Sequence, residues 1–189
     1  MMDDDRPAPV PAAAMDPEEL RLRSLYLFLA CSHAIDQFKD RLAATFPNAP
    51  LSAHLSLERS VRRELGLLFR YWTTRRIWER LESRETDAKQ LNLTLLRLFT
   101  DAFRLPKDGS GLRYAELSTS AEETQELRQR LVHALGTSHE PLMGELEAGL
   151  ATWRDAVLQY TNDALELPLE KVSQVVKAWA QRSEPRPTG

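Results

Sequence analysis

Apolar residues recur at steps of three and four along most of the chain, which is the spacing of one face of an α-helix. Asp16-Pro17 begins the first such segment with an oxygen-bearing cap and a proline at the first helical position. Pro47-Asn48-Ala49-Pro50 ends it, because proline does not continue a helix. The apolar stripe between them predicts one long amphipathic helix and consists of Leu22, Leu25, Leu29, Ile35, Phe38, Leu42 and Phe46.

The same spacing predicts five further helices, which begin near Ser52 or Ser56, at residue 87, at Ser120, near Glu140 and after Pro168. The third, over residues 87–105, carries leucines nearly all round, so we expect it to be the most buried helix. Ser120-Ala121-Glu122-Glu123 reads as a capping box for the fourth helix, and Gly136 is expected to close it.

The predicted fold is therefore all-α, a helical bundle of about six helices that can also be divided into two three-helix halves. Prolines and glycines in residues 106–111 place the division there, and residues 112–117 are expected to be extended. The expected organisation is a disordered tail over 1–15, an N-terminal helical hairpin or bundle over 16–105, a loop over 106–118, a C-terminal helical bundle over 119–182, and a disordered tail over 183–189.

The second helix contains an irregularity. Val61, Leu65, Leu68 and Trp72 follow one stripe, but Ile77, Trp78 and Leu81 fall on the opposite side. One interpretation is a kink or break near Thr73-Thr74, whose β-branched side chains are mildly unfavourable in helices. The other is a second apolar face that another element covers.

The composition of the chain says more about the cellular location of the protein than about its function. The chain has 189 residues, of which 42% are hydrophobic, and its single cysteine, Cys31, excludes an intramolecular disulfide. The first residues are acidic, whereas a signal peptide begins with basic ones, so we expect a cytoplasmic protein. The longest nearly apolar run is about eleven residues, far below the roughly 20 that span a bilayer, so no membrane association is expected.

The charge is unevenly distributed. Residues 56–105 hold 11 Lys and Arg against 7 Asp and Glu, whereas residues 114–189 hold 7 against 12. Arginine outnumbers lysine by 20 to 5, which fits either phosphate recognition or the codon usage of a GC-rich bacterial genome.

Motifs for catalysis, metals or cofactors are missing from the sequence. None of the four histidines has a glutamate three residues before it, as a di-iron bundle requires, and there is no Cys-x-x-Cys, glycine-rich phosphate loop or Gly-x-Ser-x-Gly. His33 and Asp36 are read as a helix-surface contact rather than an acid–base pair, and Cys31 as an inert core residue. We therefore expect neither an enzyme nor a cofactor.

Residues 58–84 hold the chain's most unusual segment, with eight arginines and four aromatic residues. Ile77, Trp78 and Leu81, which lie opposite the first apolar stripe, are expected to form an exposed cluster among arginines. Its composition is typical of interface hot spots. We accordingly predict a non-enzymatic helical interaction or adaptor protein, a small subunit of a larger assembly that binds a protein partner or a second copy through Tyr71, Ile77, Trp78 and Leu81.

Nucleic-acid binding is the alternative, because arginine pairs with phosphate and aromatic rings stack on unpaired bases. Against it, Glu58 with Arg62 and Arg75 with Glu79 have the four-residue spacing of ion pairs within a helix. The residues proposed for this role are Arg62, Arg63, Arg70, Arg75, Arg76, Arg80 and Arg84.

Overall fold

The structure is a computed structural model that describes residues 14–45, 51–105, 114–136 and 140–183. These residues form six α-helices and no strand, which confirms the predicted all-α bundle of about six helices. The helices are α1 (Pro17–Thr45), α2 (Leu51–Arg80), α3 (Glu85–Phe103), α4 (Ser120–Leu135), α5 (Glu140–Glu166) and α6 (Leu169–Ser183).

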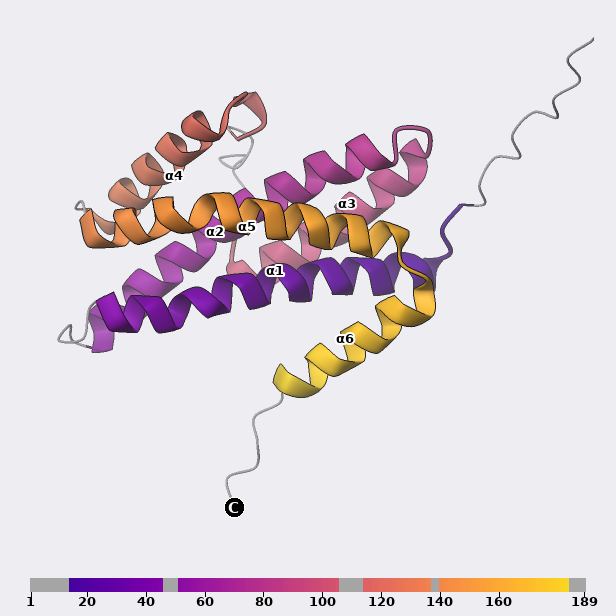
Figure 1. The fold of residues 1–189 in the computed structure, drawn as a ribbon, viewed down its shortest axis with the longest axis horizontal. Helices are drawn as coiled ribbons and strands as arrows, with labels where there is room; N and C mark the ends of the chain where they lie inside the picture. The colour runs from indigo at the N-terminus through magenta and orange to yellow at the C-terminus, as the bar shows by residue number, and fades with distance from the viewer. Residues whose placement is uncertain (1–13, 46–50, 106–113, 137–139, 184–189) are drawn as a thin grey trace, which may run out of the picture.

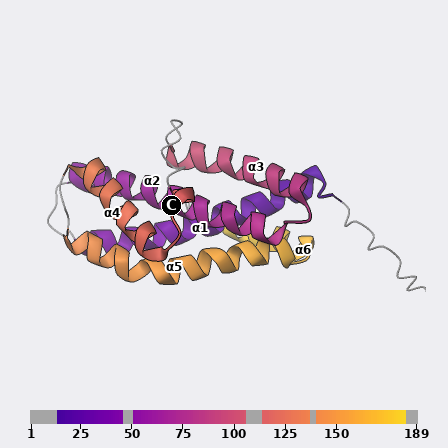
Figure 2. The same ribbon diagram turned by 90° about the horizontal axis from the view of Figure 1, so that it is seen from above.

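Helices α1 and α2 form the middle of the molecule (Figures 1 and 2). Helix α1 packs on α2, α3, α5 and α6, while α2 packs on α1, α3, α4 and α5. Seen from above, α3 lies on one side of this central pair and α5 on the other. The second half of the chain therefore packs directly on the first, and the buried residues of both belong to one continuous hydrophobic cluster.

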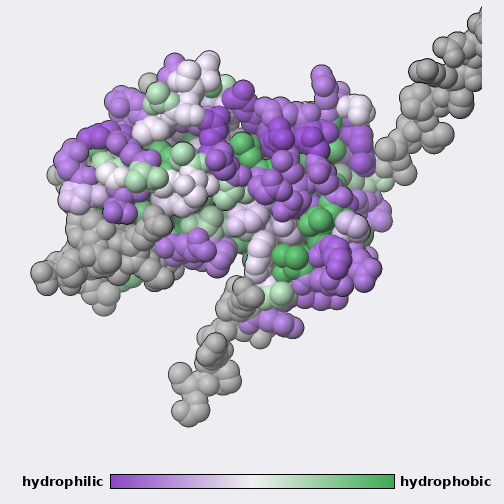
Figure 3. All heavy atoms as spheres, viewed as in Figure 1, coloured by the Kyte–Doolittle hydropathy of each residue, from purple (hydrophilic) through white to green (hydrophobic). Residues whose placement is uncertain are grey.

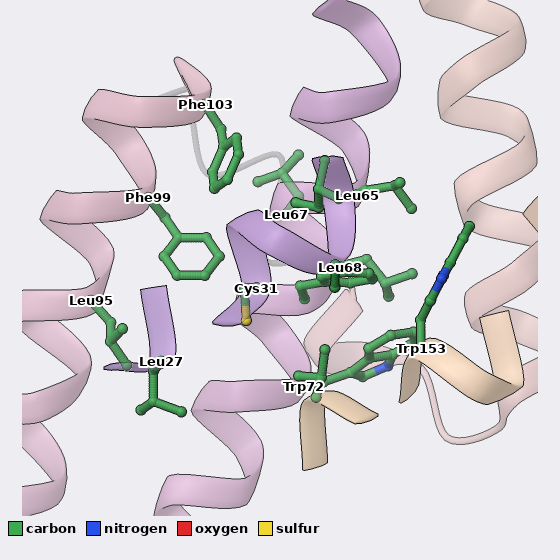
Figure 4. Close-up of a cluster of buried hydrophobic side chains, with 14 of the residues drawn as sticks. Leu27, Cys31, Leu65, Leu67, Leu68, Trp72, Leu95, Phe99, Phe103 and Trp153 are labelled. Carbon is green, nitrogen blue, oxygen red and sulfur yellow. The ribbon is translucent and has the colours of Figure 1, made fainter. Parts of the chain in front are cut away.

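Aromatic rings lie on two sides of a centre made of leucines and Cys31 (Figure 4). Trp153 on α5 meets Phe38 edge-on at 5.4 Å between ring centroids and Phe69 at 6.3 Å. On the α3 side, Phe28 and Phe99 meet at 5.8 Å. Such pairs add about 0.5–1.5 kcal/mol each beyond the area they bury, so they hold the surrounding helices in a defined register.

Helix α2 runs from Leu51 to Arg80 without a break, so a helix break near Thr73-Thr74 is wrong. The second interpretation is confirmed, because Ile77 and Leu81 on the slipped face are as buried as Leu65 and Leu68 on the first stripe. Helix α2 is thus covered on both faces. The prediction that residues 87–105 form the most buried helix is also wrong, since α3 buries one stripe and leaves Leu93 about half exposed.

The segment before α4 differs from its prediction. Residues 114–116 form a short 3₁₀ turn instead of an extended strand. The N-cap of α4 is Thr119, whose hydroxyl accepts from the backbone N–H of Glu122, and the Glu122 carboxylate accepts from the backbone N–H of Thr119. The capping box lies one residue earlier than expected, which leaves Glu123 free to point elsewhere. Gly136 closes α4 with φ 70°, as predicted.

Two contacts fix the end of the bundle where α1 and α3 begin and α5 ends (Figure 1). Arg23 on α1 is buried and donates to the carbonyl oxygens of Ala164 and Leu167 where α5 ends, a favourable place for a cation. Met15, expected in a disordered tail, is instead buried, and its N–H donates to Asp87 at 3.0 Å. The remainder of both predicted tails, 1–13 and 184–189, lies outside the described residues, as do 106–113 of the predicted loop.

Candidate functional site

Intramolecular carboxylates face most of the arginines on α2. Glu58 and Arg62 are 3.7 Å apart and Arg75 and Glu79 are 3.2 Å apart, so both ion pairs expected from the spacing are confirmed. Arg70 makes no ion pair within the described ranges, and burial lowers its pKa. The remaining pairs join Arg62 to Asp36, Arg63 to Glu64, Arg76 to Glu79, Arg80 to Glu166 and Arg84 to Asp87. Much of the positive charge of α2 is therefore balanced within the chain.

The four residues expected to bind a partner do not form one exposed cluster. Ile77 and Leu81 are part of the core, at 0% and 7% exposure, because the second face of α2 is covered. Tyr71 is half-buried and stacks on Tyr114 at 6.1 Å. Trp78, at 40% exposure, is the member that remains on the surface. An interface centred on these four residues is therefore not supported by their placement.

A cleft lies instead between α4 and α5, above α2. Helix α4 is inclined to α5 and packs mainly on α2 (Figures 1 and 2), so the two helices do not close on each other. The cavity has a volume of about 500 Å³. We call it the α4–α5 cleft; its lining residues are Leu68, Trp72, Ser120, Glu123, Thr124, Glu147, Leu150, Ala151, Arg154, Asp155 and Leu158.

The cleft has an apolar floor and two exposed carboxylates on its rim. Leu68, Trp72 and Leu150 are buried and form the floor. Glu147 and Asp155 are the exposed carboxylates, and Arg128 lies 2.9 Å from Glu147. The cleft follows α5 from Glu147 to Leu158, about 16 Å at 1.5 Å per residue.

Glu123 joins α4 to α2 at the base of this cleft. Its carboxylate is buried at 3% exposure and accepts from Trp72 Nε1 at 2.9 Å. Arg154 Nη1 lies 3.6 Å from the same carboxylate and also donates to Ser120 Oγ, so it connects α5 to the first turn of α4. A buried carboxylate needs such donors, because an unpaired charge there costs several kcal/mol.

Glu64 on α2 forms a second buried connection, to a residue about two turns beyond Glu123 on α4. It is 1% exposed, and its two oxygens lie 2.6 Å from Arg130 Nε and 2.9 Å from Arg63 Nε. Arg130 also faces Glu126 at 3.8 Å. Two cations thus hold the Glu64 carboxylate, and one of them, Arg130, attaches α4 to α2 through charge.

Tyr114 completes this contact. Its ring is buried, with the Arg130 guanidinium 5.9 Å from the ring centroid. Burial is the main cause that raises the pKa of its hydroxyl far above the usual range. The hydroxyl finds no hydrogen-bond partner among the described residues. Tyr114 therefore serves as a packing residue between α2 and α4.

Sequence reasoning missed Glu123 and Glu126 because it placed Glu123 in the capping box. The pattern held a usable signal, since Glu123 and Glu126 share the face of Leu127 and Leu131, which is the face that α4 buries. Thr119 with Glu122 is an equally good capping box and would have released Glu123 from that role.

The two other candidate groups have structural roles. Cys31 is fully buried, and burial raises the pKa of its thiol to about 12, which makes it a poor nucleophile at neutral pH. His33 is exposed and its Nε2 lies 3.1 Å from Gln37 Nε2, whereas Asp36 faces Arg62 at 2.9 Å. Over the described ranges, no group of three His, Cys, Asp or Glu is placed to hold a metal ion.

The face of the molecule seen in Figure 3 is largely hydrophilic, with separate apolar spots instead of one broad apolar patch. Scattered apolar residues of this kind are normal on a folded chain. Within the part of the chain that the structure describes, no helix has the length and apolar character to cross a membrane. The cleft, rather than an exposed flat face, is therefore the feature that stands out.

Comparison of the chain with protein-family models, with curated proteins and with solved structures gives no match.

Proposed function

We propose that this protein is a non-enzymatic helical interaction protein whose α4–α5 cleft binds an amphipathic helix with a basic polar face, supplied by a partner protein. The observation that carries the proposal is the combination of an apolar floor with the exposed carboxylates of Glu147 and Asp155 on the rim of one cleft. Grooves of this kind accept helices that present apolar residues at steps of three and four. We also propose a cytoplasmic location, because secreted proteins more often contain paired cysteines and this sequence has a single one.

Charge complementarity selects the partner. Glu147 and Asp155 are exposed on the rim; Glu147 pairs with Arg128, and Asp155 makes no ion pair within the described ranges. Lysine or arginine on the polar face of an incoming helix would approach these carboxylates, while an acidic helix would be repelled. The length of the cleft, about 16 Å, matches about 11 residues of such a helix.

A pair of substitutions on α5 tests the site. Ala151 lines the cleft and Ala148 does not, yet both are exposed residues of the same helix. Ala151→Arg places a long cationic side chain in the groove, whereas Ala148→Arg adds the same charge outside it. Neither change removes a core contact, so both variants are expected to fold.

The probe is a fluorescein-labelled 16-residue amphipathic helix with leucines on one face and lysines on the other, followed by fluorescence polarisation. We expect micromolar binding that Ala151→Arg weakens at least tenfold and Ala148→Arg changes less than threefold. A matched peptide with glutamates in place of the lysines should not bind. Equal binding of both peptides, or equal effects of both variants, contradicts the proposal.

Labelled single-stranded RNA and duplex DNA, titrated at roughly 50 and 200 mM salt, form the second arm. Contacts to phosphate weaken steeply over this range, because each one releases a counterion. Since carboxylates of the chain face most arginines of α2, we expect no binding in either salt. Tight binding at the lower salt concentration that collapses at the higher one would favour the nucleic-acid alternative instead.

A further inference from the structure

A separate cavity, which we call the α2–α3 cavity, lies where the first half of α2 meets the end of α3. Its volume is about 280 Å³, and it shares no residue with the α4–α5 cleft. Three guanidinium groups face a single carboxylate there, beside apolar side chains. The lining residues are Leu55, Glu58, Arg59, Arg62, Ala102, Phe103 and Arg104.

The three arginines are not equivalent. Arg62 is held in place, since its guanidinium lies 2.9 Å from Asp36 and 5.7 Å from the centroid of the Phe103 ring. Arg59 and Arg104 are exposed and make no ion pair within the described ranges. The cavity therefore presents one fixed cation and two cations with uncommitted hydrogen-bond donors, which is an arrangement that attracts anions.

The backbone of Arg104 gives an independent reason to single out this cavity. Arg104 is the C-cap of α3 and has φ 52° and ψ 49°, and in the described ranges no other non-glycine residue has positive φ. The corresponding position at the end of α4 is Gly136, the residue that adopts this conformation without strain. Arginine at this position keeps the strain of the left-handed backbone conformation, and its side chain lines the cavity. Non-glycine residues in strained backbone conformations cluster at functional sites.

The apolar wall of the cavity is rigid. Phe103 packs against Phe28 and Phe99 at 6.0 and 5.5 Å between ring centroids. A Cβ at Gly66 would lie 3.0 Å from Phe103 Cγ, so glycine at this place in α2 allows the ring its close approach. Because Phe103 is 5% exposed and the Arg62 guanidinium lies over its ring, the apolar surface open in the cavity is that of Leu55 and Ala102. This surface next to the guanidinium groups of Arg59 and Arg104 suits a ligand that combines an anionic group with a small apolar one.

From this geometry we infer that the α2–α3 cavity binds a phosphate monoester carried on a small apolar group. The dianionic phosphate would accept hydrogen bonds from Arg59 and Arg104, which can each offer two N–H groups, while the apolar part of the ligand lies against Leu55 and Ala102. The volume is at the lower limit for ligand pockets, which restricts the ligand to a few heavy atoms beyond the phosphate. This site is independent of the proposed partner groove.

Phenyl phosphate and inorganic phosphate are the probes, each titrated into the full chain at low ionic strength in a phosphate-free buffer and followed by calorimetry and by ³¹P NMR. We expect phenyl phosphate to bind about tenfold more tightly than inorganic phosphate, because its ring buries apolar area. The double variant Arg59→Gln/Arg104→Gln should weaken phenyl phosphate binding at least tenfold. Arg97→Gln, an exposed arginine of α3 outside the cavity, should leave it unchanged.

Arg104→Gly supplies a readout that a purely structural role would not produce. Relief of the positive φ should raise the melting temperature by about 2 °C, while the loss of the guanidinium weakens phenyl phosphate binding at least tenfold. Equal affinity for the two probes would overturn the organic ligand and leave free phosphate as the ligand. No heat and no ³¹P shift with either probe, or an Arg97→Gln effect as large as that of the double variant, would overturn the site.

Discussion

Helices α3 and α4 both pack on α2, but by different means. After Asp87, the buried face of α3 consists of Ala88, Leu91, Leu95, Phe99 and Phe103, whereas half of the buried residues of α4 are carboxylates, Glu123 and Glu126 beside Leu127 and Leu131. Apolar packing is non-directional and scales with buried area. The α4 contact instead depends on individual donor and acceptor atoms, each of which costs free energy when its partner is removed.

The candidate cleft lies beside the helix with the charged contact. Helix α3 packs its apolar stripe on both α1 and α2. Helix α4 contacts α2 through Trp72 to Glu123 and through Glu64 to Arg130 but has few contacts with α5, and the groove between α4 and α5 stays open. The same contrast leads to four predictions, which are ordered by the size of the expected effect.

Phe99→Ala should lower the free energy of unfolding by about 3–5 kcal/mol, because it removes a fully buried ring and leaves a cavity in the α3 contact. Urea denaturation followed by circular dichroism measures the change. Leu93→Ala on the same helix is the control, and since Leu93 is half exposed we expect a loss below about 0.5 kcal/mol. Similar losses in both variants would show that α3 is not held by its buried stripe.

Arg130→Leu should lower the free energy of unfolding by about 2–4 kcal/mol, because it leaves the Glu64 carboxylate buried with only the half-exposed Arg63 as a partner. Replacing both members, Glu64→Leu/Arg130→Leu, should restore a large part of the lost free energy of unfolding, since two apolar side chains leave no carboxylate buried at this place. A double variant less stable than Arg130→Leu alone would contradict the charge-based attachment of α4.

Trp72→Phe should cost about 1–3 kcal/mol and should act mainly on α4, because the Glu123 carboxylate loses its 2.9 Å donor while the aromatic packing is largely kept. Hydrogen exchange of the α4 amides is expected to accelerate more than that of α3. Glu123→Gln keeps an oxygen acceptor for Trp72 and should have the smaller effect. Uniform acceleration across the bundle would instead mean that α4 does not open separately.

Glu122→Gln should have the smallest effect and should change its pH dependence. Hydrogen bonds from the backbone N–H groups of Ser118 and Thr119 hold the pKa of the Glu122 carboxyl below its usual range. A carboxyl with a lowered folded-state pKa stabilises the protein above its unfolded pKa, and that stability is lost as pH falls through the folded pKa. Melting temperatures of the two proteins should therefore differ at pH 7 and converge near pH 3. A gap that widens in acid would contradict this assignment.

Local signals account for the parts of the fold that were predicted. Asp16-Pro17, Gly136 and Pro168 each act within about one helical turn, so the ends of helices can be read from a few neighbouring residues. The capping box before α4 shows the limit of this method. Two overlapping patterns, beginning at Thr119 and at Ser120, satisfied the same rule, and only the packing of Glu123 against Trp72 distinguished them.

The sequence by itself determined the amphipathic helices, six of them over the described residues, and approximately where most of them begin and end. Tertiary structure alone decided which faces meet: it buried Ile77 and Leu81, kept Trp78 on the surface, and brought Trp72 to Glu123 across 51 positions of the chain. The physical reason is the range of the interactions. Helix formation depends on residues three or four apart, whereas burial depends on side chains from distant segments that become neighbours only when the whole bundle packs.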